Sequence, residues 1–455
     1  MAPRKRFSVL RDPVHGDVYL THEEISVLDT PEMQRLRGIK QLGAAHLVYP
    51  GATHTRFEHS IGTLHLAQRM IDAINLGFEL SPRDSLRVSD EEARVIRLAA
   101  LVHDVTHIPF GHNIEDQAGL MERHDSSGRF ERMLAPGTGV GRALRELGVQ
   151  RDVLNILAGA PGRDSVPPYW SQINADTICS DLLDYLARDA YYTGLKILVD
   201  PRILSYFKVD RASGNLYIEL AKHSLLREDI LSEAVRMLEA RYYFSERVYY
   251  HHAKVSAGAL VSRAVELALR EGLIEESELH EATDASLLAR LDAAAERAEP
   301  AVRRRLRALV ERFVQRRLPK RACVFPRLEN EAVQEDLVSR YFDRRRAAER
   351  AAVEERLADL VRFATGREVE ILVYCPAARM QLKEAQTHVR WPGVEGLHPL
   401  SEFAERVPRL ADLERSYRDL WKFYVFADAS DPVLLARVAE IAQGEFPHAR
   451  NVYRP

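Results

Sequence analysis

The stretch that decides the fold of this 455-residue chain is Leu98-Ala-Ala-Leu-Val-His-Asp-Val-Thr-His107. Its apolar helical pattern ends at the adjacent pair His103-Asp104. The apolar residues three, four and seven positions before His103 share its helix face, so we expect the imidazole to point inward. A buried imidazole beside a buried carboxylate is costly unless something compensates for it. A divalent cation does so efficiently, and this pair of groups suits several such ions.

Two more candidate ligands lie on neighbouring predicted helices. His59 falls in a helical pattern over residues 57–76, and Asp181 falls in another over residues 176–192. One ligand from each flanking helix and two from the middle helix would form a site inside a helical bundle. The alternative is that these are separate polar residues that never meet.

A group of histidines follows the His-Asp pair: His107, His112 and His124. Histidine titrates near neutral pH, which suits proton transfer to a leaving oxygen. The same residues are also candidates for further metal ligands or for solvated loop positions. Spacing alone leaves these three interpretations open.

The pattern along the chain predicts a mainly α protein in four parts. These are an N-terminal segment (1–25), a helical core (26–260), a helical region (261–365) and a small C-terminal α+β lobe (366–455). Helix starts are expected at Thr30-Pro31, with the helix running to Lys40, and at the capping box that begins at Ser89. A β-hairpin is predicted over 206–220, strands over 369–375 and 421–426, and a closing helix over 431–443.

Composition excludes some classes of protein. Hydrophobic residues make up 46% and charged residues 29% of the chain, as in ordinary globular proteins. The net charge of -3 gives no overall attraction to nucleic acid. No uncharged apolar run is long enough for a membrane span, and the basic N-terminus lacks the apolar stretch of a signal peptide. Three distant cysteines, Cys179, Cys323 and Cys375, predict a reducing, cytoplasmic setting.

Two arginine runs, 303–305 and 344–346, lie in predicted helices that are rich in glutamate. A solvated face with salt bridges is favoured there over nucleic-acid binding. Nucleic acid therefore stays a second, less favoured partner.

Five motifs occur in a fixed order along the chain. They are Asp12-Pro-Val-His-Gly16, Asp29-Thr-Pro-Glu-Met-Gln-Arg-Leu-Arg-Gly-Ile-Lys-Gln-Leu-Gly43, Pro50-Gly-Ala-Thr-His-Thr-Arg-Phe-Glu-His-Ser60, His103-Asp-Val-Thr-His-Ile-Pro-Phe-Gly-His112 and Asp184-Tyr-Leu-Ala-Arg-Asp189. Together they resemble the HD-domain deoxynucleoside triphosphate triphosphohydrolases. The likeness covers residues 8–260 and, more weakly, 369–426.

The resemblance implies an HD-domain helical bundle that hydrolyses a deoxynucleoside triphosphate to a deoxynucleoside and triphosphate. It implies that the metal ligands are His59, His103, Asp104 and Asp181. The sequence does not distinguish Zn, Fe, Mn, Mg, Ni and Co. The implied catalytic residues are His107, His112 and His124, with His112 protonating the leaving 5′ oxygen, and with Asp125 as the carboxylate that follows them.

The implied substrate contacts are Gln41, Tyr185 and Asp189 around the 3′-hydroxyl, Leu42 under the sugar, and Arg56 and Arg241 near the phosphates. The resemblance also implies an activating-nucleotide site at Asp29, Gln34 and Arg37, where Ser8 replaces a lysine. Such sites lie between subunits, so a homo-oligomer, either dimer or tetramer, is expected.

One departure from the family pattern weakens the substrate prediction. The family's triphosphate-binding lysine on the Asp181 helix is replaced by Leu183, which cannot contact an anion. Three hypotheses therefore remain: a deoxynucleoside triphosphate triphosphohydrolase, a phosphomonoesterase, phosphodiesterase or nuclease, and a non-catalytic protein that senses nucleotides or binds nucleic acid.

Overall fold

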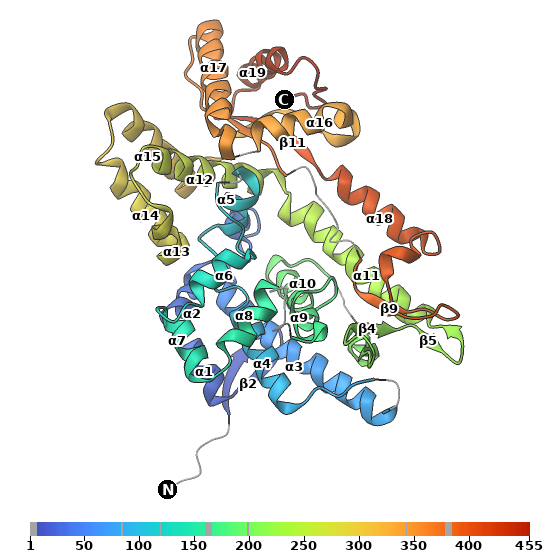
Figure 1. The fold of residues 1–455 in the computed structure, drawn as a ribbon. Helices are drawn as coiled ribbons and strands as arrows, with labels where there is room; N and C mark the ends of the chain where they lie inside the picture. The colour runs from blue at the N-terminus through green and yellow to red at the C-terminus, as the bar shows by residue number, and fades with distance from the viewer. Residues whose placement is uncertain are drawn as a thin grey trace.

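The computed structural model shows a mainly helical protein with small sheets, as the sequence predicted (Figure 1). In Figure 1 the N-terminal half forms the lower body, and α16, α17 and α19 lie at the top, at the opposite end. The structure describes residues 7–82, 85–118, 120–159, 166–197, 200–342, 344–377 and 385–455. Within these residues, every helix is too short or too polar to span a lipid bilayer.

The helices fall into an N-terminal and a C-terminal series. The first series is α1 (His22–Leu28), α2 (Pro31–Arg35), α3 (Arg56–Leu80), α4 (Asp90–Val102), α5 (Gly111–Ala118), α6 (Ser127–Met133), α7 (Gly139–Glu146), α8 (Gln150–Ala158), α9 (Pro168–Ala175) and α10 (Ser180–Thr193). The second series is α11 (Glu228–Phe244), α12 (His252–Arg270), α13 (Glu276–Glu281), α14 (Asp284–Ala295), α15 (Pro300–Val314), α16 (Arg327–Tyr341), α17 (Ala347–Thr365), α18 (Pro408–Asp419) and α19 (Pro432–Glu445).

The strands form four small sheets. The strands are β1 (Ser8–Asp12), β2 (Gly16–Leu20), β3 (Phe207–Val209), β4 (Leu216–Glu219), β5 (Ala221–Lys222), β6 (Leu225–Leu226), β7 (Lys320–Pro326), β8 (Ile371–Tyr374), β9 (His388–Arg390), β10 (His398–Pro399) and β11 (Lys422–Ala427). Their orders are β1-β2, β10-β9-β4-β3, β5-β6 and β7-β11-β8. The predicted hairpin is present as the antiparallel pair β3-β4.

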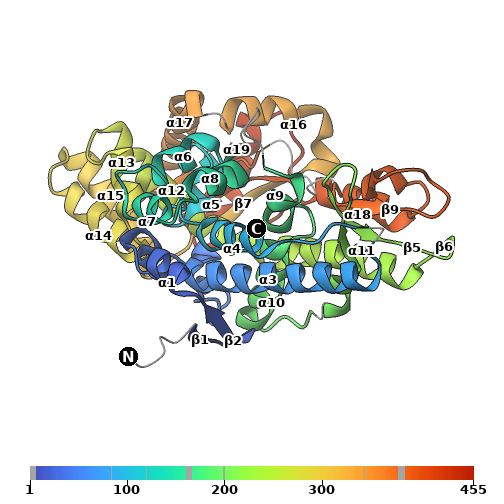
Figure 2. The same cartoon turned by 60° about the horizontal axis from the view of Figure 1, so that its bottom comes forward.

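Helix α3 organises the lower body, where it packs against α4 and α10 (Figure 2). Two capping boxes set the starts of α3 and α4. In each box the cap hydroxyl accepts the backbone N–H of the glutamate three residues on, and the carboxylate of that glutamate accepts the backbone N–H of the cap residue. The caps are Thr55 with Glu58, and Ser89 with Glu92. The predicted box at Ser89 is confirmed, and α4 delivers His103 directly after its last turn.

Two predicted helices are shorter than expected. The helix predicted from Pro31 to Lys40 ends at Arg35, a 3-10 turn follows to Gly38, and Lys40 then forms a bridge with Thr55. The helix predicted from residue 176 begins at Ser180, because the residues before it are bonded to a distant segment: the Ile178 N–H donates to the Thr387 hydroxyl.

The region predicted as helical, 261–365, contains a strand at Lys320–Pro326, where the prediction is wrong. This stretch is β7, an edge strand that pairs with the central strand β11. Its apolar run Ala322–Phe325 is buried on both faces, and such a run has no period that separates strand from helix. The three-stranded sheet therefore crosses the predicted boundary between residues 365 and 366, and the four-part division of the chain stays a prediction.

A buried ion cluster joins α12 to the more C-terminal elements α17 and β8. Glu354 of α17 is 1% exposed, pairs with Arg263 of α12 and accepts the Val373 N–H of β8 at 2.8 Å. Arg350 of α17 lies next to it and is 2.8 Å from Glu266 of α12. The cluster thus ties α12, α17 and β8 together without exposing a charge.

Replacing Glu354 by alanine leaves two buried arginines, Arg263 and Arg350, with Glu266 as their one remaining carboxylate in the cluster, so we expect the free energy of unfolding to fall by about 3–5 kcal/mol. The neighbouring Glu355, whose side chain is 61% exposed, is the matched control. Its alanine variant should change stability by less than about 1 kcal/mol. Thermal and urea unfolding measure both, and equal effects would contradict the role of the cluster.

Candidate metal centre and active site

The four predicted metal ligands meet where α3, α4 and α10 pack together. The Nε2 atoms of His59 and His103 are 3.2 Å apart, and His59 Nε2 is 2.9 Å from Asp181 Oδ1. Asp104 places one oxygen 3.5 Å from His103 Nε2 and the other 3.8 Å from His59 Nε2. Asp181 keeps 34% of its side chain exposed, so the group is open on that side.

Hydrogen bonds behind the two imidazoles decide which atoms face this site. His59 Nδ1 is 2.7 Å from the Asp184 carboxylate, and His103 Nδ1 is 2.8 Å from the Ala100 carbonyl oxygen. Both partners only accept, so each Nδ1 carries a proton and each neutral ring turns an Nε2 lone pair inward. Two lone pairs facing each other repel unless a proton or a cation lies between them. The donor set of two imidazoles and two carboxylates therefore fits a divalent cation.

The electrostatics of the site favour positive charge. Burial lowers the pKa of His59, but hydrogen bonds with Asp181 and Asp184 outweigh it and raise the pKa to about 10. Burial opposes ionisation of Asp104 as well, yet Arg56 and the neighbouring imidazoles hold its pKa well below the usual range. Without metal the site therefore holds an extra proton at neutral pH, which a cation would replace.

Arg56, a predicted phosphate contact, is buried beside the metal centre. Its guanidinium is buried and donates to Asp104 Oδ2 at 2.7 Å and to the Gln41 carbonyl oxygen at 3.3 Å. Its Nε atom is buried without a hydrogen-bond partner among the described residues. The arginine thus borders the metal centre with donor capacity to spare.

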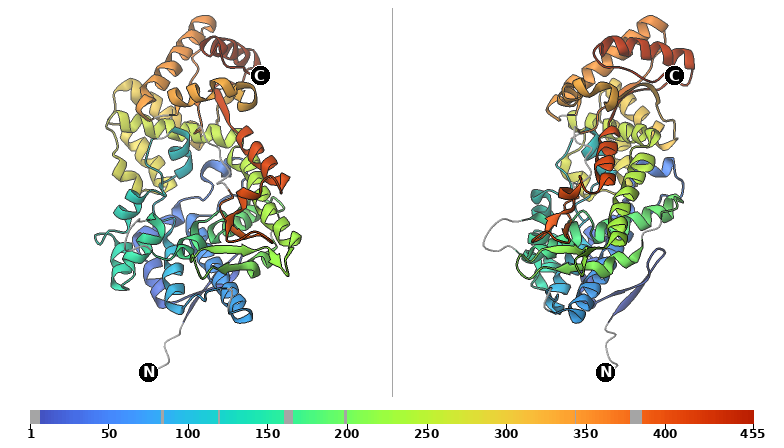
Figure 3. Two further views of the ribbon diagram at one scale, coloured as in Figure 1. Left: turned by 45° about the vertical axis from the view of Figure 1, so that its right-hand side comes forward. Right: turned by 90° about the vertical axis from the view of Figure 1, so that its right-hand side faces the viewer.

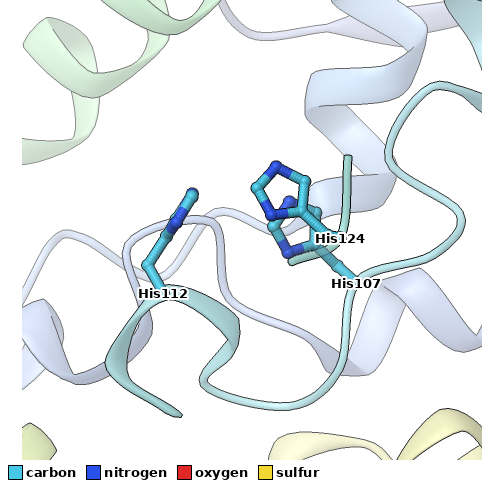
Figure 4. A group of neighbouring side chains, drawn as sticks. All are labelled: His107, His112 and His124. Atoms are coloured by element: carbon cyan, nitrogen blue, oxygen red, sulfur yellow. The ribbon is translucent and has the colours of Figure 1, made fainter. Parts of the chain in front are cut away.

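The three predicted catalytic histidines also meet (Figure 4). The rings of His107 and His124 are stacked 3.8 Å apart, and the His112 ring stands across both, 5.2 Å from His107 and 4.9 Å from His124. His107 is fully buried and its Nε2 is 3.2 Å from Asp104 Oδ1, whereas His112 is exposed. The row of imidazoles therefore runs from the metal centre to the surface.

These histidines are close enough to suggest a second metal site. The rings of His107 and His124 are only 21° from parallel, so their lone pairs run side by side instead of converging on one point. Burial also lowers the pKa of both residues, which keeps both rings neutral at pH 7. This geometry favours proton transfer and anion binding over a second cation.

The carboxylate that contacts the histidine row is Glu115, not the predicted Asp125. Glu115 Oε2 is 2.9 Å from His124 Nδ1, and its other oxygen accepts from Arg129. Asp125 turns away, with 56% of its side chain exposed, and pairs with Arg123 at 3.0 Å. Arg129, His124 and His107 hold the pKa of Glu115 far below its usual value although burial opposes this, so Glu115 is ionised. It orients the His124 ring.

The predicted sugar contacts come from residues 41–42 and from α10, and together we call them the sugar wall. Gln41 Oε1 is buried without a hydrogen-bond partner among the described residues, and Leu42 is 7% exposed. Asp189 is already bonded at 2.8 Å to His54 and at 2.6 Å to the Tyr249 hydroxyl. Burial raises the pKa of Tyr185, which keeps its phenol protonated.

The phosphate contacts are fewer. Arg241 is partly buried, and nearby tyrosines, Tyr185 first among them, raise its pKa although burial opposes the charge. It therefore stays a cation close to Tyr185. Leu183 is 7% exposed and packs in the core with Leu182, so α10 offers no cation at either position. Leu183 therefore presents no charged group at the position where the family has its lysine.

The predicted effector residues lie together at α1 and α2. Gln34 donates to the Leu28 carbonyl oxygen and accepts from Arg37 Nε at 2.8 Å, while Asp29 is exposed at the end of α1. Arg37 also stacks 3.6 Å above the Phe57 ring. The activating-nucleotide site at these residues stays a prediction.

Sequence reasoning missed several residues that hold the site. Asp184 fixes His59, Glu115 fixes His124, and Asp284 accepts the N–H groups of Lys40 at 3.0 Å and Phe110 at 3.1 Å. Phe110 has φ of 54°, so Asp284 stabilises an unusual backbone in the histidine loop. Asp184 stood in a quoted motif, but no local pattern marks Glu115 or Asp284.

Comparisons with known proteins agree with this geometry. Residues 56–189 match the model of the HD domain, and residues 218–442 match that of the HD associated region. The chain belongs to the HD-domain superfamily. The HD-domain match contains all four candidate metal ligands and the three clustered histidines.

Similar proteins extend this result. An uncharacterised protein of Methanocaldococcus jannaschii is 30% identical over 282 residues, 62% of this chain and 54% of that protein. The deoxynucleoside triphosphate triphosphohydrolase SAMHD1 homolog of Dictyostelium discoideum is 31% identical over 216 residues, 45% and 40% of the two chains. The HD-domain chain thus spans about half the length of these relatives.

The fold is also found in a solved structure. A hypothetical protein from Aquifex aeolicus superposes with a TM-score of 0.66 over 96% of this chain and 100% of that one, at 22% identity. The two chains therefore share the same overall fold.

Metal analysis tests the centre directly. We expect purified protein to hold about one divalent transition metal per chain, and Asp181→Ala to lose most of it because a carboxylate donor is removed. Elemental analysis by mass spectrometry measures both. Asp125→Ala, which removes the carboxylate paired with Arg123, should keep the wild-type metal content.

Acid unfolding tests Glu115. Its folded pKa lies below its unfolded value of about 4.5, so the stability that it contributes is complete above that pH and is lost as the pH falls below it. Replacing Glu115 by glutamine should therefore lower the unfolding temperature by a constant amount between pH 5 and 7, measured by calorimetry. Below pH 4.5 the difference in unfolding temperature between the variant and the wild type should narrow, and a widening difference would contradict the role of Glu115.

Proposed function

We propose that this protein is a metal-dependent phosphohydrolase that hydrolyses deoxynucleoside triphosphates to deoxynucleoside and triphosphate. The observation that carries the proposal is the contact between Asp104 and His107, 3.2 Å apart, which joins the cation donor set to the row of three histidines. Such a site has a place for a cation beside a phosphorus and a proton donor beside a leaving oxygen.

The proposed roles follow from burial and hydrogen bonding. When bound, the cation would neutralise charge on the phosphate and make water more acidic. Arg56, held between Asp104 and the Gln41 carbonyl, directs its remaining N–H groups towards phosphate oxygens. His112 is the exposed member of the row, so it can take a proton from solvent and give it to the 5′ oxygen of the leaving group.

The remaining histidines position the phosphate and the donor. His124 is fixed by Glu115, so its Nε2 is directed away from that carboxylate. His107 is neutral and buried between His124 and Asp104. Together they form a polar surface for a phosphate that does not repel anions.

The sugar would lie against Gln41 and Leu42. The buried Oε1 of Gln41 lacks a partner among the described residues, and a 3′-hydroxyl would supply one. Leu42 offers only apolar surface, which leaves a 2′-hydroxyl without a hydrogen bond and so favours deoxyribose. Tyr185 and the Asp189–Tyr249 pair complete this wall.

The alternative is hydrolysis of a shorter phosphate ester. Leu183 stands where the family has its triphosphate-binding lysine, and its neighbour Leu182 is also uncharged, so α10 supplies no phosphate-binding cation at these two positions. Arg241 remains as a charged group near the sugar wall. A nucleoside monophosphate or an oligonucleotide end needs fewer cations than a triphosphate does.

Regulation and assembly belong to the same proposal. The group Asp29, Gln34 and Arg37 would bind an activating nucleotide between subunits of a homo-oligomer. The three cysteines Cys179, Cys323 and Cys375 are buried and lie outside any disulfide, which fits a reducing, cytoplasmic setting.

The test is incubation of metal-loaded protein with each deoxynucleoside triphosphate, ribonucleoside triphosphate and deoxynucleoside monophosphate, followed by product identification. Tripolyphosphate supports the main proposal, and orthophosphate supports the alternative.

Removal of the proton donor in His112→Ala should lower kcat by about 10²–10⁴-fold without loss of metal. His448→Ala, at an exposed histidine of the C-terminal lobe, should match the wild type. Tight nucleotide or nucleic-acid binding without turnover would contradict both enzymatic readings.

A further inference from the structure

The Asp184 carboxylate behind the metal centre is fully used by its neighbours. Its Oδ2 accepts from His59 Nδ1 at 2.7 Å and from Arg188 Nε at 2.9 Å. Its Oδ1 accepts from His15 Nε2 at 2.6 Å and from Arg188 Nη2 at 2.9 Å. Each oxygen therefore takes two donors, and the carboxylate has no freedom to rotate.

His15 reaches this carboxylate from the turn of the β1-β2 hairpin, far before the HD-domain match. Figure 2 shows the hairpin beside α3 and α10, and β2 packs on α3. The same turn contributes Asp12, which is 5% exposed. Asp12 Oδ1 accepts the N–H groups of Val14 and His15, so it fixes the backbone that carries the imidazole.

The contacts close into a ring. Asp12 Oδ2 accepts from Arg188 Nη1 at 2.8 Å, and Arg188 donates two hydrogen bonds to Asp184. Asp184 also accepts from His15, whose backbone N–H donates to Asp12. Arg188 and Asp184 are both fully buried. Two carboxylates on one guanidinium leave a net negative charge behind His59, which favours the protonated Nδ1 and so the inward Nε2 lone pair.

Tight packing holds the ring against α3. A Cβ atom on Gly62 would lie 1.8 Å from Asp184 Oδ1 and 2.4 Å from Arg188 Nη2. The glycine one turn after His59 therefore lets Asp184 approach the helix that carries the metal ligand. The His15 ring is also stacked on His65 of the same helix, with centroids 5.3 Å apart.

We propose that His15, carried by the N-terminal hairpin, is a positioning residue of the metal centre, and that it acts through Asp184 on the ligand His59. The inference rests on the metal-binding part of the proposed function. Its content is that residues 8–20 belong to the metal centre although they precede the HD-domain match. Loss of the His15 donor leaves Asp184 Oδ1 with the Arg188 Nη2 bond alone, which loosens the His59 ring and weakens cation binding.

A matched pair of variants tests this. Glutamine and methionine have similar length and volume, but only His15→Gln keeps an N–H donor near the position of Nε2. We expect His15→Met to weaken Co²⁺ binding by about 10–100-fold, as loss of a partner behind a metal ligand usually does. His15→Gln should stay within about threefold of the wild type. The Co²⁺ absorption spectrum gives the dissociation constant by competition with a chelator.

The control is Arg11→Ala on the same hairpin, where Arg11 is 77% exposed and pairs only with Asp17 among its described ion pairs. It should bind Co²⁺ like the wild type. Thermal unfolding of the metal-free proteins checks the fold, and a His15→Met protein that unfolds is replaced by His15→Leu in the same comparison. Equal Co²⁺ affinities of the donor and non-donor variants overturn the inference alone, whereas a wild type that binds no Co²⁺ overturns the metal centre as well.

Discussion

Two imidazole Nε2 atoms that face each other across 3.2 Å, inside a helical body, are the constraint on which the site depends. His59 comes from the first turn of α3, and His103 follows the last turn of α4. Their Nδ1 atoms are already bonded to acceptors, so neither ring can flip without losing a buried hydrogen bond. The packing of α3 on α4 and α10 thus creates one point in the structure where positive charge is favoured.

The groups on the two sides of this point differ in mobility and exposure. On one side Arg56 and the neutral His107 touch Asp104, and the histidine row leads out to the exposed His112. On the other side Asp184 is locked by four donors and admits no change. The centre therefore has a rigid back and an open front, which is the arrangement that chemistry on a bound phosphate ester requires.

The site draws on more of the chain than the HD-domain match. Asp12 and His15 come from the N-terminal hairpin, Tyr249 follows α11, and Asp284 begins α14. Thr387 of the C-terminal region holds the backbone just before α10, the helix of Asp181. A fold shared over almost the whole length with the Aquifex aeolicus protein is consistent with one integrated unit. The HD domain is the part that carries the donors, and the other segments fix where the donors point.

The sequence by itself determined the helical class, the capping box that starts α4, the β3-β4 hairpin and the four candidate ligands, because each depends on local periodicity or on a motif. It could not give β7, since a short apolar run buried on both faces looks alike in strand and helix. Nor could it show that Glu115 and not Asp125 contacts His124, or that His15 reaches Asp184, because these contacts depend on how distant segments pack. Local chemistry named the donors, and only tertiary packing decided their partners and orientation, since a hydrogen bond between residues far apart in the chain has no signature in either neighbourhood.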